Sequence, residues 1–218
     1  MLDIGKLRAA GVKNIKSVEE NGPEVVVRTS SGDRTFAKRD VLLEKCLTCK
    51  GVEYMVQDEV LESRELPFDT EDRFARVAEL EAMTPEERFD FWRGELSRCI
   101  RCNACRNACP VCSCNTCLFD NPRSGVPSKA NSDSFEENMF HIIRAFHVAG
   151  RCTDCGECGR VCPQNIPLHL LNRKFIKDIN AFYGEFQAGA DPEVKSPLTD
   201  YKTGDVGPNV VNERGGGA

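Results

Sequence analysis

The stretch Cys99–Pro110, CIRCNACRNACP, decides the fold, because its arrangement of cysteines returns at Cys152–Pro163, CTDCGECGRVCP. Both stretches follow the pattern C-x2-C-x2-C-x3-C-P. The sequence therefore contains an internal duplication in which four thiols and one proline keep the same spacing. Thiols placed this closely in both copies predict two metal-binding loops of the same shape.

The chain has 13 cysteines among its 218 residues, and disulfides are the main alternative to metal binding. Disulfide-rich chains are typically short and secreted. The sequence begins MLDIGKLRAAGVKNIKSVEE, which has no apolar core of a signal peptide, and no stretch approaches the roughly 18 apolar residues of a membrane span. We therefore expect a cytoplasmic protein without membrane insertion, whose reduced thiols bind metal. The formal net charge of −5 argues against a nucleic-acid partner.

The duplicated pattern resembles that of bacterial two-cluster ferredoxins, in which the fourth cysteine of each run ligates the other cluster. The resemblance implies that [4Fe–4S] cluster I is bound by Cys99, Cys102, Cys105 and Cys162. It implies that [4Fe–4S] cluster II is bound by Cys109, Cys152, Cys155 and Cys158. Two zinc sites would not need eight cysteines with both prolines in place.

Five cysteines lie outside this pattern. We predict a third [4Fe–4S] cluster, bound by Cys46, Cys49, Cys114 and Cys117. Cys112 in place of Cys114 is an alternative. Zinc is the alternative metal at this site, because two C-x-x-C pairs also suit tetrahedral zinc.

Cationic side chains are frequent beside the cysteines. Five arginines either favour the reduced clusters electrostatically or are ordinary surface residues: Arg98, Arg101, Arg106, Arg151 and Arg160. His141, His147 and His169 fall in helical patterns, so we expect them to pack or face solvent rather than to ligate metal.

The predicted fold class is α+β, with a bacterial dicluster ferredoxin-like core, inserted helices, a small β-rich N-terminal cap and an irregular C-terminal tail. The predicted boundaries are 1–45 for the cap, 46–98 for an acidic helical segment, 99–186 for the dicluster domain and 187–218 for an extended or disordered tail. Within the cap, turns at 21–23 and 31–33 flank a β-branched run and predict a meander of short strands.

Four helices are predicted from apolar residues at helical spacing. They cover about 71–83, the stretch after a capping box at Thr84, 134–150 and 168–184. We expect the apolar stripes to form the core, including that of the third helix: Phe135, Met139, Ile142 and Phe146.

The sequence contains no G-x-G-x-x-G after a strand, no P-loop and no Ser/His/Asp or Cys/His catalytic arrangement. KCLTCK (45–50), the acidic stretch and RCIRCNACRNACPVCSCNTC (98–117) together look similar to the electron-transfer regions of formate dehydrogenase and deazaflavin-reducing hydrogenase β subunits. They also resemble the small iron–sulfur subunits of tungsten aldehyde oxidoreductases and class II benzoyl-CoA reductase. Those β subunits carry a further flavin domain, so we do not extend their flavin chemistry to this sequence.

These resemblances imply an electron-transfer subunit of an anaerobic oxidoreductase complex. It would carry electrons between a flavin or ferredoxin partner and a catalytic subunit. The alternatives are a free polyferredoxin and an iron–sulfur enzyme that reduces disulfides.

Overall fold

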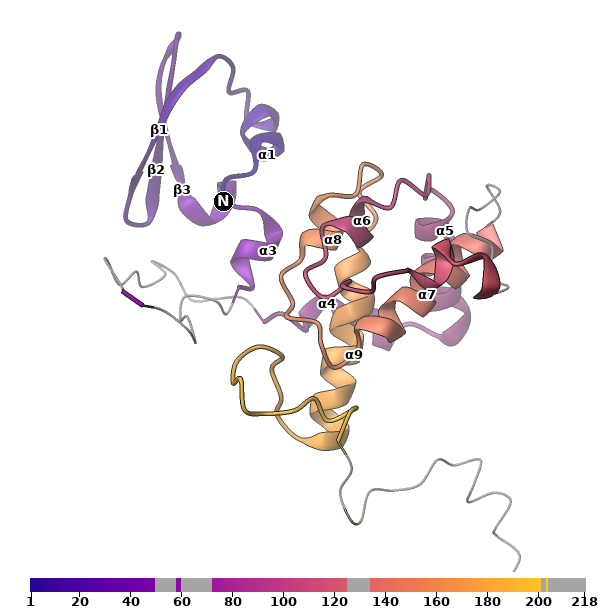
Figure 1. The fold of residues 1–218 in the computed structure, drawn as a ribbon. Coiled ribbons are helices and arrows are strands. Elements are labelled where there is room, and N and C mark those ends of the chain that lie inside the picture. Colours follow the sequence, from indigo (N-terminus) through magenta and orange to yellow (C-terminus); the bar gives the residue numbers. More distant parts are fainter. Residues whose placement is uncertain (50–57, 60–71, 125–133, 201–202, 204–218) are drawn as a thin grey trace, which may run out of the picture.

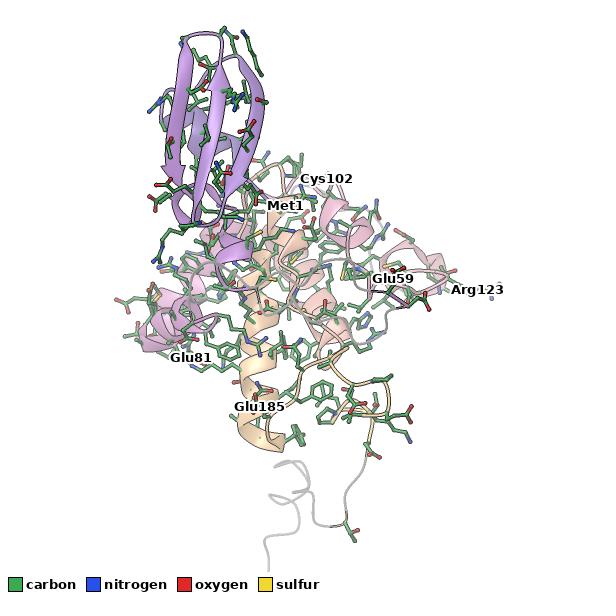
Figure 2. The ribbon with its side chains drawn as sticks, turned by 90° about the vertical axis from the view of Figure 1, so that its left-hand side faces the viewer. Met1, Glu59, Glu81, Cys102, Arg123 and Glu185 are labelled. Atoms are coloured by element: carbon green, nitrogen blue, oxygen red, sulfur yellow. The ribbon has the colours of Figure 1, made fainter. Side chains whose placement is uncertain are left out.

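The computed structural model describes residues 1–49, 58–59, 72–124, 134–200 and 203. Its architecture is α+β: a three-stranded antiparallel sheet stands clear of a body of helices and loops in both views (Figures 1 and 2). Among the described residues, no helix is both long and apolar enough to cross a membrane.

The sheet is the predicted meander, formed by β1 (Ile15–Asn21), β2 (Glu24–Thr29) and β3 (Gly32–Ala37) in that order. Asn21 pairs with Glu24, so the first hairpin turns at Gly22 and Pro23 as the sequence predicts. Val25 and Val27 lie on one face of β2, and both are fully buried.

Two short helices cover these valines and complete a small separate core. Helix α1 (Ile4–Ala9) contributes Leu7, and α2 (Lys38–Val41) contributes Val41. The sequence interpretation missed α1, which is only six residues long and is capped by the side chain of Asp3.

The helical body is built from α4 (Ala75–Ala82), α5 (Pro85–Leu96), α7 (Ser134–Val148) and α9 (Leu168–Tyr183). Helix α7 contacts α5 and α9, and α9 also contacts α4. All four predicted helices are present. Thr84 and Glu87 form the predicted capping box of α5, with Thr84 Oγ1 accepting from Glu87 N at 3.2 Å.

Short elements link this body to the cysteines. They are α3 (Glu44–Leu47), α6 (Ala104–Asn107), α8 (Glu157–Arg160) and the 3₁₀ turns η1 (Leu118–Asp120) and η2 (Pro122–Ser124). Helices α6 and α8 pack against each other.

The predicted core stripe of α7 is wrong. Phe135 is 67% exposed and Phe146 is 62% exposed, and Met139 and Ile142 also face solvent. The helix instead buries Phe140 together with polar side chains. The physical reason is that the inner face of α7 contacts the cysteine loops, where cations and hydrogen-bond donors would stabilise thiolate ligands.

The main core includes one cysteine of each run. Cys105 and Cys158 are buried in one cluster with Leu96, Phe140 and Ile166. On α9, the predicted stripe is buried at Leu168 and Ile179 but ends in Phe182, which is 78% exposed.

The described part of the tail is irregular, as predicted. Residues 187–200 form no helix or strand and lie against the second cysteine loop, where Gln187 Nε2 donates to Thr153 O at 3.4 Å. The rest of the predicted tail lies outside the described residues, as do 50–57 and 60–71 of the acidic segment.

Candidate metal centre

The two cysteine runs have the same backbone shape. In the first run, Arg101 and Asn103 have φ angles of 52° and 60°. In the second, the equivalent residues Asp154 and Gly156 have φ angles of 59° and 69°. Two left-handed residues in each C-x2-C-x2-C stretch curl the chain around one point, so the duplication in the sequence is a duplication in structure.

The hydrogen bonds that follow are duplicated as well. Cys109 N donates to Arg106 O, and Cys162 N donates to Gly159 O, both at 3.2 Å. In each run, the fourth cysteine follows a short helix that contains the third cysteine. This helix is α6 in the first run and α8 in the second.

One cavity has a lining that mixes the two runs. It is formed by apolar residues including Phe140 and Leu168, and by four cysteines: Cys99, Cys102, Cys105 and Cys162. The fourth cysteine of the second run therefore lies with the first three of the first run.

The reciprocal arrangement involves Cys109. When it is ionised, Cys109 raises the pKa of both Cys152 and Cys155, although burial is the largest cause at each. The Cys109 sulfur therefore lies within electrostatic range of the second run.

The spacing of the sulfurs distinguishes a cluster from single ions. Tetrahedral zinc with Zn–S bonds near 2.3 Å holds its sulfurs about 3.8 Å apart. Among the described residues, which include all 13 cysteines, no three cysteine sulfurs lie within 4.8 Å of one another. A cubane whose thiolates bind different irons needs wider spacing. The donor set thus fits [4Fe–4S] clusters better than zinc.

Burial explains why these thiols need a metal to ionise. It raises the pKa of Cys99 to about 12, of Cys152 to about 11 and of Cys158 to about 12. Without a cluster, these three thiols are therefore neutral near pH 7. Cluster assembly supplies the positive charge that makes them thiolates and releases protons.

Arg144 of α7 is the cation that the cysteines of both runs share. It is 5% exposed, and its Nη2 donates to Cys105 O at 3.0 Å. Ionised cysteines raise its pKa, and these include Cys105 of the first run and Cys158 of the second. Its Nε has no hydrogen-bond partner among the residues that the structure describes. A buried guanidinium with a free N–H suits an anionic group held between the loops.

His141, one helical turn before Arg144, contacts Cys99. Its Nε2 lies 3.2 Å from Cys99 Sγ, and the ring is 2% exposed. Burial lowers the pKa of His141 to about 3, so the ring is neutral and carries one N–H. Nδ1 has no partner among the described residues, which favours the proton on Nε2, facing the sulfur.

Glu137 and Arg101 complete this inner face of α7. Arg101 Nη1 lies 3.7 Å from Glu137 Oε2, and its guanidinium lies 4.0 Å from the centre of the Phe140 ring. Atoms of Cys99, Glu137 and His141 lie within 4.8 Å of one another, but the nearby Arg101 disfavours a separate cation there.

The five arginines beside the cysteines differ in role. Arg101 is buried at the site, and Arg106 pairs with Asp120. Arg98 and Arg160 pair with Glu95 and Glu157 on the surface, so they behave as ordinary surface residues. Sequence reasoning missed Arg144, His141 and Glu137, whose only signal is their i, i+4, i+7 spacing on one helix.

The predicted third-site cysteines lie in two places. Cys46 is in α3, and Cys117 directly precedes η1. In Figure 1, α3 and the 118–124 segment lie on opposite sides of the helical body. The joint site of Cys46, Cys49, Cys114 and Cys117 remains a prediction.

Helix α3 instead lies over the loop of the second run. Lys45 pairs with Glu157, and a Cβ added at Gly156 would stand 2.7 Å from Lys45 Cβ. Gly156 is therefore required both by its positive φ and by this close approach.

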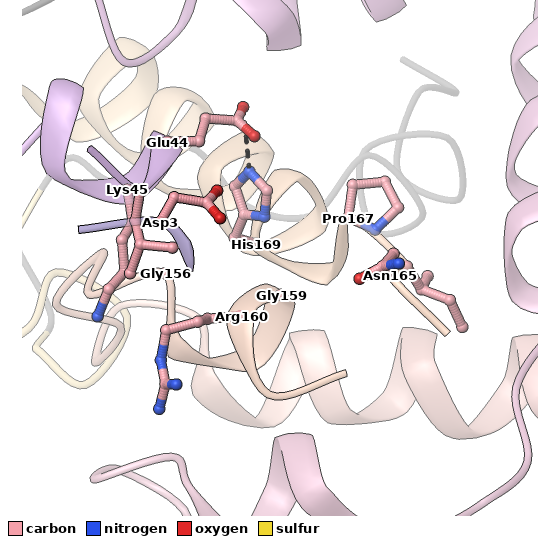
Figure 3. A pocket seen from close by; sticks show the side chains of 11 residues that line it. Asp3, Glu44, Lys45, Gly156, Gly159, Arg160, Asn165, Pro167 and His169 are labelled. Carbon is pink, nitrogen blue, oxygen red and sulfur yellow. Dashed lines mark ion pairs between the residues drawn. The ribbon is translucent and has the colours of Figure 1, made fainter. Parts of the chain in front are cut away.

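A cavity lies between the N-terminal part of the chain and the loop of the second cysteine run (Figure 3). It is lined by Asp3, Glu44, Arg160 and His169, among others, and His169 Nε2 lies 4.0 Å from Glu44 Oε1. His169 therefore joins two parts of the chain and contacts no cysteine in this arrangement.

Two loops of one shape, a cavity lined by cysteines of both runs and a shared buried cation define a two-cluster iron–sulfur domain. Residues 95–166 match the family model of the 4Fe–4S dicluster domain. The match spans both cysteine runs and the inserted helix α7.

Three relatives are similar to parts of this chain. The F420-dependent formate dehydrogenase subunit beta of Methanocaldococcus jannaschii is 32% identical over 87 residues, 39% of this chain and 22% of that protein. The succinate dehydrogenase iron–sulfur subunit of Bacillus subtilis is 32% identical over 100 residues, 44% of this chain and 39% of that one. Putative ferredoxin-3 of Sinorhizobium fredii is 36% identical over 44 residues, 20% of this chain and 42% of that protein.

The chain thus spans less than half the length of each of these relatives. The resemblance to a formate dehydrogenase β subunit is confirmed over the matched part. An iron–sulfur electron-transfer role follows from the domain and from these relatives.

Proposed function

We propose that this chain is the electron-transfer subunit of an anaerobic, cytoplasmic oxidoreductase complex. It carries electrons between a flavin or ferredoxin partner and a catalytic subunit. The observation that carries the proposal is that Cys162 shares a cavity with Cys99, Cys102 and Cys105. When bound, [4Fe–4S] clusters accept and donate single electrons.

The ligand sets proposed here are those that the ferredoxin resemblance implies. Cys99, Cys102 and Cys105 hold cluster I with Cys162, whose place in the same cavity supports the assignment. Cluster II is held by Cys109, Cys152, Cys155 and Cys158. The effect of Cys109 on the pKa of Cys152 and Cys155 supports this second set.

Partner subunits are supported by the exposed face of α7. Met139, Ile142 and Phe146 are 40%, 44% and 62% exposed on a helix whose other face contacts the cysteine loops. A surface of this kind favours association with another protein. Two relatives are named as subunits, one of formate dehydrogenase and one of succinate dehydrogenase.

Anaerobic purification after gentle lysis tests the proposal. We expect the chain to migrate with at least one further redox protein, and its dithionite-reduced clusters to be reoxidised when that partner's acceptor is added. Migration as a monomer would favour a free polyferredoxin. Disulfide or substrate reduction by the isolated chain would make it an enzyme. Either result would overturn the subunit assignment.

A further inference from the structure

The three cysteines that follow the first run line a second cavity. It lies between the 111–121 segment and α7, and Cys112, Cys114 and Cys117 all line it. Its volume is about 680 Å³, far larger than the cavity of a single ion. Neither Cys46 nor Cys49 lines it.

The same cavity is lined by three arginines. Arg106 Nη1 donates to Asp120 Oδ2 at 2.7 Å. Arg144 lines it as well, and its buried Nε has no partner among the described residues. Arg151 lines the wall on the α7 side. Three positively charged side chains around three thiols would balance the charge of an anionic group, whereas they would repel a bare metal cation.

We propose that Cys112, Cys114 and Cys117 bind a third [4Fe–4S] cluster, in which one iron has no cysteine ligand. The proposal rests on the proposed electron-transfer function, because such a cluster extends the same path. It replaces the third set predicted from the sequence, which paired Cys114 and Cys117 with Cys46 and Cys49.

The duplication explains how Cys112 comes to this position. Cys112 N donates to Cys109 O at 3.2 Å, as Asn165 N donates to Cys162 O at 3.0 Å in the second run. The first run thus has a thiol where its duplicate has an amide. The backbone hydrogen bond between Cys112 and Cys109 places the third site next to a proposed ligand of cluster II.

Sulfur spacing favours a cluster over zinc at this site as well. No three cysteine sulfurs among the described residues lie within 4.8 Å, whereas tetrahedral zinc needs about 3.8 Å. Three thiolates bound to three different irons of one cubane would stand farther apart than the sulfurs of a zinc site.

Iron, sulfide and zinc counts on the full chain, reconstituted anaerobically, test this proposal. We expect about twelve irons for three clusters in the wild type, and about eight in Cys112→Ser, Cys114→Ser and Cys117→Ser. The matched controls Cys46→Ser and Cys49→Ser should keep about twelve. Cys114 is exposed, so Cys114→Ser should fold, and unchanged signals of clusters I and II would confirm that it has.

A spectroscopic measurement checks the open iron. One-electron oxidation of a [4Fe–4S]²⁺ cluster by ferricyanide, with release of Fe²⁺, leaves [3Fe–4S]⁺. Its isotropic paramagnetic resonance signal should appear in the wild type and be absent from Cys114→Ser.

Three results would overturn the proposal: iron lost from the Cys46 or Cys49 variants, one zinc retained per chain, or about eight irons already in the wild type. The last result would leave the proposed function standing. Failure of clusters I and II themselves would instead overturn the proposed function.

Discussion

Arg144 Nη2 donates a 3.0 Å hydrogen bond to the carbonyl oxygen of Cys105, although Arg144 belongs to the helix inserted between the two cysteine runs. This contact fixes a buried positive charge among ligands of both proposed clusters. The inserted helix α7 is therefore part of the electrostatic environment of the metal centre.

Replacing Arg144 by glutamine should lower the reduction potentials of both clusters. Reduction adds negative charge, and a unit charge about 8 Å away is worth roughly 2 kcal/mol at an effective dielectric near 20, or about 90 mV for one electron. Redox titration followed by paramagnetic resonance measures the change.

Two variants control for this effect. Arg144→Lys should recover much of the potential because it keeps the charge, and Arg98→Gln should change nothing because Arg98 is exposed and paired with Glu95. Unchanged potentials in a folded Arg144→Gln protein would contradict the role assigned to Arg144.

Replacing His141 by leucine should lower the potential of cluster I alone. The variant removes the donor that lies 3.2 Å from Cys99 Sγ, and hydrogen bonds to sulfur favour the reduced state. A shift on the order of tens of millivolts is expected. His147→Leu, on the exposed side of the same helix, is the matched control. Equal shifts in both clusters would show that the hydrogen bond is not the cause.

Replacing Asp154 by asparagine should destabilise the loop of the second run. Asp154 Oδ1 accepts from Arg173 Nε at 2.7 Å, and Arg73 Nη1 lies 3.5 Å from Oδ2, all three side chains being under 10% exposed. Asparagine tolerates the φ of 59°, so the variant removes the charge without straining the backbone.

Two buried arginines then lose their counter-charge, at a cost of about 3–5 kcal/mol. Anaerobic urea unfolding, followed by loss of cluster absorbance, should show a clearly lower midpoint. Asp90→Asn breaks an exposed pair with Arg93 and should leave the midpoint nearly unchanged. Equal midpoints for the two variants would be incompatible with a structural role for Asp154.

Features governed by local chemistry could be predicted from the sequence. The duplicated cysteine spacing returns as duplicated φ angles and hydrogen bonds, and the Thr84 box begins α5 as predicted. The hairpin at 21–24 follows from its turn residues. Each of these depends on a few neighbouring residues.

The failures have a common physical cause. Apolar periodicity predicted the buried face of α7, but the helix exposes Phe135 and Phe146 and buries His141 and Arg144. A helix against sulfur ligands gains from polar contacts, and a hydrophobic pattern alone does not reveal this. The joint site of Cys46, Cys49, Cys114 and Cys117 stays a prediction, because spacing in the sequence does not show which surface a C-x-x-C segment will cover.

The central claim is that the two runs exchange their fourth cysteines. Paramagnetic resonance of the reduced Cys109→Ser protein tests it most directly, with Cys162→Ser as the reciprocal variant. We predict that Cys109→Ser loses the signal of the cluster held by Cys152, Cys155 and Cys158 and keeps the other. Loss of the cluster held by Cys99, Cys102 and Cys105, with the second cluster intact, would contradict the account.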